Sequence, residues 1–344
     1  MTTTLELEIH EQPSSLARLI ESQQAAVTAA AEAIRAFAPD YVVIAARGTS
    51  DNAARYAQYV WGIKCGLYVG LATPSVNSLY HASINFRRAL VVGISQSGAS
   101  VDIRSVVEHA RSQGALTLSL TNDASSPLAQ VSDHHIDLSA GIEKSVAATK
   151  TYTAELTAVA MLAAAFTGDA NDHTAIAQVP SWAAQTLGLS AGIDAAPFTY
   201  MPNFAVIGRG YNYATAFEIT LKVQELCYVT GSGYSEADFR HGPIAIIQPA
   251  FPAIAVAPSG ATLPAMLDLL DKLGERQARR LVISDSEDAL AKAEVRMPIP
   301  QRIPEWLTPI VSVIPGQVFA LRLAHAKGHS VDQPRGLTKV TVTR

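Results

Sequence analysis

Three serines gather where an apolar stretch meets a stretch with helical spacing. Val91–Ile94 is apolar, Ser95, Ser97 and Ser100 follow around a glycine, and residues 101–107 have the spacing of a helix. The pattern predicts a buried strand, a turn and a helix start. The unpaired N–H groups and the dipole of a helix start attract anions, and the hydroxyls can add donors around one phosphate. The turn has no lysine or arginine, which excludes a Walker loop; an ordinary serine-capped turn is the alternative.

Charged side chains recur on one face of a predicted helix in the second half of the chain. Within residues 214–229, Glu218, Lys222 and Glu225 are spaced by four and three residues, which puts them on one helical face. A solvated, salt-bridged face is the usual reason for such spacing. The rest of this helix is apolar, however, which favours charges that line a cleft. There Lys222 could hold a carboxylate ionised or stabilise a developing enolate.

A histidine and a lysine lie in segments where proton transfer or imine chemistry is possible. His241 stands before Gly242-Pro243, and a histidine in such a turn is poised for exposure and for proton transfer near neutral pH. Lys339 lies near apolar residues in the tail 330–340, where partial burial would favour its neutral, imine-forming state. A surface lysine on an edge strand is the alternative. The pair at 134–135 lacks metal-ligand spacing and receives no role.

The amino-acid composition limits the classes of protein to which this chain can belong. The 344 residues are 49% hydrophobic with a formal net charge of −4, which suits two globular domains and gives no basic footprint for nucleic acid. The first residues lack the pattern of a signal peptide, and residues 156–166, the most apolar helix candidate, are too short to cross a bilayer. Cys65 and Cys227 lack metal spacing. We expect a cytoplasmic protein without a nucleic-acid or membrane partner.

Strand-like and helix-like segments alternate along the chain. Expected strands are 41–46, 91–94, 116–120, 135–138, 204–208, 254–257 and 280–283, and expected helices are 14–37, 51–59, 101–107, 145–165, 181–189, 214–229 and 306–327. This order predicts an α/β fold with parallel, doubly wound sheets. In such sheets ligands bind beyond the carboxyl ends of the strands.

The two halves repeat one plan. Arg47-Gly48 and Arg209-Gly210 lie 162 residues apart, as do Ser97-Gly98 and Ser259-Gly260, which indicates a duplicated domain. The two arginines are candidate phosphate ligands or partners in structural ion pairs. Only the first half has the serine-rich turn. The predicted organisation is an N-terminal helix (1–35), a phosphate-binding domain (36–168), a linker (169–197), a second domain (198–330) and a C-terminal tail (331–344).

Six motifs together resemble the sugar isomerase (SIS) domain family in its tandem form, similar to the isomerase half of glucosamine-6-phosphate synthase. They are Arg-Gly-Thr-Ser at 47–50, Ser-Gln-Ser-Gly at 95–98, Val-Ala-Ala-Thr-Lys at 146–150, Leu-Lys-Val-Gln-Glu-Leu at 221–226, Arg-His-Gly-Pro at 240–243 and Asp-Gln-Pro-Arg-Gly-Leu-Thr-Lys at 332–339. The resemblance implies two flavodoxin-like SIS domains, each a parallel sheet with flanking helices, and a phosphosugar substrate.

The resemblance also implies roles for individual residues. Glu225 would move a proton between C1 and C2 of the sugar with Lys222 beside it, His241 would open the ring, and Lys339 would engage the open-chain carbonyl. The substrate-binding residues it implies are Gly48, Thr49, Ser50, Ser95, Gln96, Ser97, Ser100, Val146, Ala147 and Thr338. The ring-opening histidine would come from the neighbouring subunit, so a homodimer with a shared active site is expected. No metal and no organic cofactor are expected.

Two departures from the synthase bear on the reaction. Ala99 and Ala148 stand where the synthase has a glutamate and a serine, which implies different sugar contacts. The SIS pattern begins close to residue 35, and neither cysteine is N-terminal, so no glutaminase domain with its nucleophilic cysteine is expected. The expected activity is therefore a deaminase and isomerase that converts glucosamine 6-phosphate to fructose 6-phosphate and ammonia. The alternatives are a fructosamine-6-phosphate deglycase, a galactosamine-6-phosphate deaminase/isomerase, and a non-catalytic phosphosugar-binding regulator.

Overall fold

The computed structural model describes residues 2–339 and divides into two compact units. Unit 1 comprises residues 1–13, 144–149 and 179–337, and unit 2 comprises residues 14–143, 150–178 and 338–344. The predicted domains fall one in each unit. Residues 1–13 of the predicted N-terminal helix and residues 144–149 of the predicted first domain belong to unit 1. They pack with the second half of the chain.

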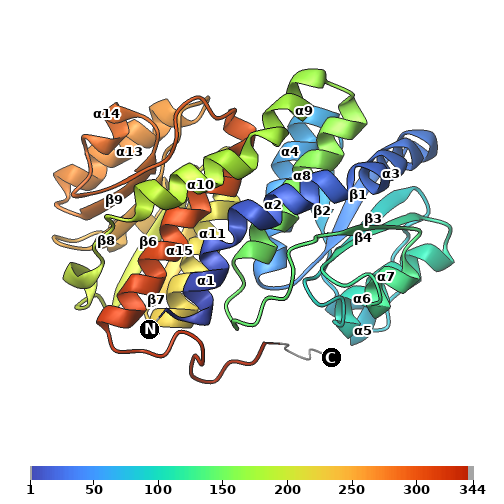
Figure 1. Ribbon diagram of the computed structural model, residues 1–344, viewed down its shortest axis with the longest axis horizontal. Helices are drawn as coiled ribbons and strands as arrows, with labels where there is room; N and C mark the ends of the chain where they lie inside the picture. The colour runs from blue at the N-terminus through green and yellow to red at the C-terminus, as the bar shows by residue number, and fades with distance from the viewer. Residues whose placement is uncertain (1, 340–344) are drawn as a thin grey trace. The chain divides into compact units, whose positions relative to one another are not determined.

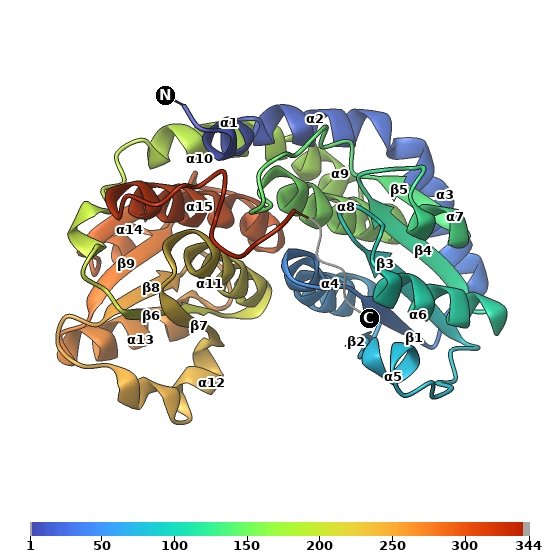
Figure 2. The same cartoon turned by 90° about the horizontal axis from the view of Figure 1, so that it is seen from below.

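Unit 2 contains one parallel sheet of five strands. The strands are β1 (Tyr41–Ala45), β2 (Val69–Leu71), β3 (Ala89–Ile94), β4 (Leu116–Thr121) and β5 (His134–Asp137), in the order β2-β1-β3-β4-β5. Helices α4 (Thr49–Cys65) and α8 (Lys150–Thr167) pack together on one face, with α3 (Gln24–Phe37) against α8. On the other face lie α5 (Ser75–Ser78), α6 (Val101–Ser112) and α7 (Pro127–Val131) (Figure 2). The central strand β3 is buried along its whole length, because helices cover both faces of a parallel sheet.

Unit 1 contains a second parallel sheet of five strands. They are β6 (Asn203–Gly208), β7 (Thr230–Ser235), β8 (Pro252–Val256), β9 (Arg279–Ser284) and β10 (Val295–Pro298), in the order β10-β9-β8-β6-β7. Helices α11 (Tyr213–Cys227), α15 (Thr308–Ala326), α10 (Val179–Ser190) and α1 (Thr4–His10) form one layer, and α12 (Glu236–Arg240), α13 (Leu263–Glu275) and α14 (Glu287–Leu290) form the other (Figure 1).

The two sheets have the same topology. Counted from β7, the second sheet runs β7-β6-β8-β9-β10, which is the order β2-β1-β3-β4-β5 of the first sheet. Each is a doubly wound α/β sheet of the flavodoxin type, as the sequence predicts. The shared order gives the recurring 162-residue offset a structural basis, since both motif pairs follow equivalent strands.

Several elements differ from the sequence prediction. The single helix expected over 14–37 is divided into α2 (Gln12–Ser22) and α3, with a break at Gln23. The long helix expected from residue 145 begins at Lys150. The linker forms α9 (Ala170–Ala177), which was not predicted, and α10, which confirms the helix predicted over 181–189. Strands β2, β7 and β10 were not predicted. The strand-like end of the tail, from residue 340, lies outside the described residues.

One helix within the described residues is long and apolar enough to cross a membrane. Residues 305–326, which include α15, meet that criterion, and 94% of the tested window is buried inside the protein. The helix packs against α10 and α11 within unit 1, and such burial is typical of a core helix. Gly316 allows the close approach to α11, because a Cβ there would lie 2.4 Å from the Ile219 side chain.

Candidate active site

The serine-rich turn lies at the carboxyl end of the central strand of unit 2. The backbone N–H of Gly98 donates to the Ser95 hydroxyl at 3.2 Å, and the N–H of Ala99 donates to the Ser97 hydroxyl at 3.3 Å. Ser100 caps the start of α6, and among the described residues its buried Oγ has no hydrogen-bond partner. A buried hydroxyl beside the first amides of a twelve-residue helix suits a phosphate oxygen.

Gly98 is required by the shape of this turn. Its φ is +59°, and a Cβ at this position would lie 2.2 Å from the Ser126 Oγ. Only glycine combines that backbone conformation with that close approach. The backbone of the turn at Gly98 therefore lies in close contact with Ser126, the residue before α7.

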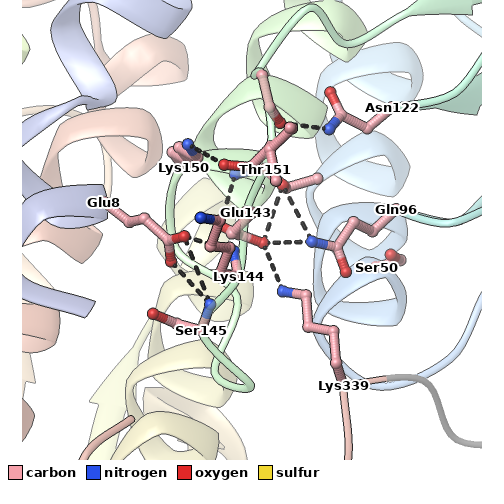
Figure 3. A network of polar contacts seen from close by, with 12 residues as sticks. Glu8, Ser50, Gln96, Asn122, Glu143, Lys144, Ser145, Lys150, Thr151 and Lys339 are labelled. Carbon is pink, nitrogen blue, oxygen red and sulfur yellow. Dashed lines mark hydrogen bonds and ion pairs between the residues drawn. The ribbon is translucent and has the colours of Figure 1, made fainter. Parts of the chain in front are cut away.

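A buried glutamate that the sequence analysis did not single out holds the neighbourhood of the turn together. The Glu143 side chain is 0% exposed, and one of its oxygens accepts hydrogen bonds from the Gln96 amide and the Thr151 hydroxyl (Figure 3). The other oxygen accepts the Thr151 backbone N–H at 3.2 Å. A buried carboxylate needs several donors, and here they come from the turn and from the start of α8. Its position after β5, the last strand of the sheet, was the signal in the sequence that could have identified it.

Lys339 joins the same carboxylate. Its Nζ lies 3.1 Å from Oε2 of Glu143, with the lysine side chain 26% exposed (Figure 3). Unit 2 therefore brings together two of the predicted elements, namely the serine turn, through Gln96, and the tail lysine. Thr338, the residue before Lys339, is exposed.

The tail that carries Lys339 is anchored upstream on unit 1. The Asp332 carboxylate accepts the backbone N–H groups of Thr4 and Leu5, both at 3.0 Å, at the start of α1. The Arg335 guanidinium lies 4.6 Å from the centre of the Tyr228 ring, and its backbone N–H donates to the Tyr228 hydroxyl at 2.6 Å. These contacts fix the direction of the chain a few residues before Lys339.

The other predicted ligands of the first half follow β1. Gly48 precedes α4 with a φ of +55°, and Thr49 and Ser50 form the first turn of that helix. The Ser50 hydroxyl donates to the buried carboxylate of Glu155 at 2.7 Å. The hydroxyl therefore has a protein partner, which orients its oxygen at the carboxyl edge of the sheet.

The two arginines of the repeat are engaged in ion pairs. Arg47 lies 3.1 Å from Asp102 in the first turn of α6, and Arg209 pairs with the buried Glu236. Both arginines hold neighbouring elements in place, as the structural alternative expects. Arg47 remains 47% exposed in its side chain.

A buried lysine sits between two carboxylates on α11 in unit 1. The Lys222 Nζ lies 3.3 Å from Glu218 and 2.7 Å from Glu225, and only Glu225 reaches solvent, with 21% of its side chain exposed. Burial alone would lower the pKa of Lys222. Coulombic attraction to Glu218 and Glu225, and the hydrogen bonds that the ammonium donates to both carboxylates, outweigh the effect of burial and raise the pKa of the lysine. Lys222 is therefore a fixed cation behind an accessible carboxylate, which suits proton transfer at Glu225.

His241 ends the short helix α12 and is exposed. The preceding Arg240 is anchored by Glu236 and by Asp268, so the histidine extends from a fixed support. Unit 1 places this histidine at the surface.

The loop 144–149 carries the predicted ligands Val146 and Ala147. The buried carboxylate of Glu8 on α1 accepts the backbone N–H groups of Lys144 and Ser145 at the start of this loop (Figure 3). Ala147 is buried and Val146 is partly exposed. Within unit 1, the first helix of the chain thus positions this loop.

Among residues 2–339, no cluster of three or more His, Cys, Asp or Glu side chains could hold a metal ion. The polar groups described above are carboxylates, hydroxyls, amides and ammonium groups. Such groups can bind a sugar phosphate and move protons.

Comparison with known proteins agrees with the duplicated sheets. The SIS domain family matches residues 38–165 and 202–327. The chain is 32% identical over 98% of its length to glutamine–fructose-6-phosphate aminotransferase [isomerizing] of Aquifex aeolicus, of which it spans 57%. It is also 32% identical to a protein of Silicibacter pomeroyi DSS-3 assigned as a phosphosugar isomerase, with a TM-score of 0.86 over 96% of this chain and 99% of the other.

A third similarity concerns the fold alone. The crystal structure of glucosamine-6-phosphate deaminase from Thermotoga maritima has a TM-score of 0.79 over 99% of this chain and 100% of the other, at 19% identity. The two matched regions each contain one of the five-stranded sheets. The chain is a member of the SIS family with two SIS domains in tandem.

Proposed function

We propose that the protein is an isomerase and deaminase of amino-sugar phosphates, with glucosamine 6-phosphate as the leading substrate. The observation that carries the proposal is the α11 arrangement, in which a buried ammonium backs one solvent-accessible carboxylate, Glu225. The serine turn of unit 2 supports a phosphate site of the kind that a phosphosugar enzyme needs, because the buried Ser100 hydroxyl at the start of α6 has no partner among the described residues. The names of the relatives support this class of substrate.

The proposed reaction uses protein side chains throughout. His241 moves the proton that opens the pyranose ring, and the freed aldehyde lies next to the carbon that bears the amine. Glu225 removes the proton from C2 and returns it to C1, while one proton passes from the amine nitrogen to O1, so that the aldehyde and amine become a C1 alcohol and a 2-imine. Water then hydrolyses the imine, so that glucosamine 6-phosphate and water yield fructose 6-phosphate and ammonia. Lys222 stabilises the negative charge that develops during the transfer.

We further propose a cytoplasmic homodimer in which His241 serves the site of the partner subunit. The exposed position of His241 at the end of α12 supports this arrangement, because an exposed side chain is available to a second chain. In the proposal, Lys339 completes the substrate-binding residues of unit 2, with Glu143 as the residue that positions Gln96 and Lys339.

The experiment is an assay with a panel of phosphorylated amino sugars and a matched pair of variants. Ammonia and fructose 6-phosphate are measured from glucosamine 6-phosphate, beside galactosamine 6-phosphate and fructosamine 6-phosphate. Glu225→Gln should lower kcat by about 10²–10⁴-fold with an unchanged fold, because it removes the proton acceptor at constant size. Glu218→Gln is the comparison, since it also removes one carboxylate from Lys222 but at a fully buried position; it should affect stability more than kcat.

Each alternative has its own outcome. Release of a free amine from fructosamine 6-phosphate would identify a deglycase, and preference for the galactosamine substrate would identify the other epimer. Binding of these sugars without turnover would identify a regulator. Turnover of glucosamine 6-phosphate by Glu225→Gln at the wild-type rate would contradict the mechanism.

A further inference from the structure

The helix α12, which carries His241 at its end, is too short to be stable by itself. It has five residues, whereas isolated helices shorter than about 12–15 residues are marginal in water. Its position therefore depends on β6, β7 and α13, against which it packs (Figure 2). One contact is apolar, because Phe239 is fully buried in the core of unit 1. The other contacts are ionic and begin at the first residue of the helix.

Glu236, the first residue of α12, lies between two arginines. Its side chain is only 1% exposed. One of its oxygens pairs with Arg209, the residue after β6, and the other pairs with Arg240, one turn further along α12. Each oxygen of this buried carboxylate therefore has its own guanidinium, and the pair with Arg209 joins the start of the helix to the end of β6.

Arg240 extends these ionic contacts to α13. Its guanidinium lies 2.6 Å from the Asp268 carboxylate and donates a hydrogen bond to the Ala265 carbonyl at 3.0 Å. His241 is the next residue in the chain. The residue before the histidine is thus held from two sides, by Glu236 and by α13.

Stability alone does not account for a carboxylate at position 236. Burial of a carboxylate costs free energy that its ion pairs barely offset, and well-packed apolar residues in its place are often as stable. Arg209 and Arg240 are 41% and 24% exposed, so water can still solvate them without Glu236. The carboxylate adds direction instead, because two paired guanidinium groups restrict the orientation of α12.

We propose that Glu236 is a positioning residue for the reaction, which fixes the direction in which α12 presents His241. In this role it does not touch the sugar, and it acts through the histidine that opens the pyranose ring. The inference rests on the proposed function, because Glu236 has this role only if His241 moves the ring-opening proton. A displacement of about 1 Å in such a group can lower a rate by about 10²-fold.

A mutant cycle on the turnover of glucosamine 6-phosphate tests this role. Glu236→Gln keeps the size of the side chain and removes its charge, so it should lower kcat by about 10–10²-fold with little change in KM. In a His241→Ala background the same substitution should change the rate by less than about twofold, because the residue through which it acts is gone. Single turnovers with excess enzyme make these slow rates measurable. Equal losses in both backgrounds, or a Glu236→Gln protein as fast as wild type, would overturn the proposal.

Two further variants separate positioning from stability. Arg209→Met breaks the same ion pair from the other side, so its loss of kcat and that of Glu236→Gln should not add when the two are combined. Glu294→Gln is the matched control, because Glu294 also pairs with an arginine, Arg280, at 2.7 Å, but beside β10 at the opposite edge of the sheet. It should lower the melting temperature and keep the wild-type kcat. If it loses as much activity as Glu236→Gln does, the positioning role is wrong.

Amide hydrogen exchange tests the support of α12 without any turnover. Peptides that cover residues 236–242 should exchange faster in Glu236→Gln than in wild type, because α12 then opens more often, while peptides from α11 should be unchanged. Unchanged exchange in α12 would overturn the proposal. If wild type converts none of the sugars, or if His241→Ala is as fast as wild type, the proposed function fails and the catalytic role of Glu236 fails with it. The exchange result then still decides whether Glu236 fixes α12.

Discussion

At the scale of single residues, Glu143 shows how one buried carboxylate can organise a site. It takes donors from the serine turn, from α8 and from the tail, so loss of any one donor leaves the others attached. In the sequence only the position of Glu143 after β5 indicates this role, because the residue lies in a loop without periodicity. Glu225 and Lys222 were predictable, since helical spacing places them on one face of an otherwise apolar segment.

The ion pair of Glu143 and Lys339 should be energetically coupled. In a double-mutant cycle, Glu143→Gln and Lys339→Met should show an interaction of about 0.5–3 kcal/mol in the free energy of unfolding, because the carboxylate is fully buried. Urea denaturation measures each variant. The same cycle at Asp40 and Arg88, whose side chains are 52% and 69% exposed, should give about 0–1 kcal/mol. Equal coupling at both pairs would contradict the positioning role of Glu143.

His135 on β5 should make stability fall with acid. Burial lowers the pKa of His135 below its ordinary 6.5, and attraction to Asp137 and Asp123 offsets only part of that effect. As the pH falls through 6.5, the histidine therefore takes up a proton in the unfolded chain, while in the folded chain it stays neutral until a lower pH. The stability from the neutral histidine is present above that pH and is lost as the pH falls toward the lower, folded-state pKa. Melting temperatures from about pH 8 to about pH 5 should fall less steeply in His135→Gln than in wild type; identical slopes would exclude this residue as the cause.

At the scale of elements, the strands that the sequence analysis missed lie at sheet edges. β7 reads Thr-Gly-Ser-Gly-Tyr-Ser, β2 has three residues and β10 has four with Arg296 among them, so none shows a long apolar run. Each of these strands pairs with one neighbouring strand. Their extended conformation depends on that pairing more than on the β-propensity of their residues. The central strands β3 and β8 were predicted because both faces are buried and their sequences are apolar throughout.

The serine turn should tolerate no side chain at Gly98. Gly98→Ala adds about 1–3 kcal/mol of overpacking against Ser126 to the cost of the left-handed backbone, and phosphate binding should weaken with it. Gly114→Ala is the matched control, since Gly114 has a φ of +80° but open space around its Cβ position. Thermal unfolding and phosphosugar binding distinguish the two. A Gly98 variant that behaves as the Gly114 variant does would show that the close approach is unimportant.

At the scale of the whole molecule, the proposed shared site predicts complementation between inactive variants. Glu225→Gln and His241→Ala each disable a different part of the site. If the histidine comes from the partner subunit, dissociation and random reassociation of the two variants should restore about a quarter of wild-type activity, because half of the dimers then hold one intact site of two. Native mass spectrometry, which separates the mixed dimer from the two homodimers by mass, confirms that mixed dimers form. Mixed dimers without activity would place both residues in a site within one subunit.

The hydrogen bonds from Thr4 and Leu5 to Asp332 have a consequence for biosynthesis. The first helix leaves the ribosome early, yet its carboxylate partner is 328 positions downstream. At about 5–20 residues per second, the nascent α1 waits on the order of tens of seconds for that partner. During that interval its apolar side, with Leu5 and Ile9, has no finished unit to cover it. Nascent-chain chaperones that shield amphipathic segments should therefore engage α1 until Asp332 has been synthesised.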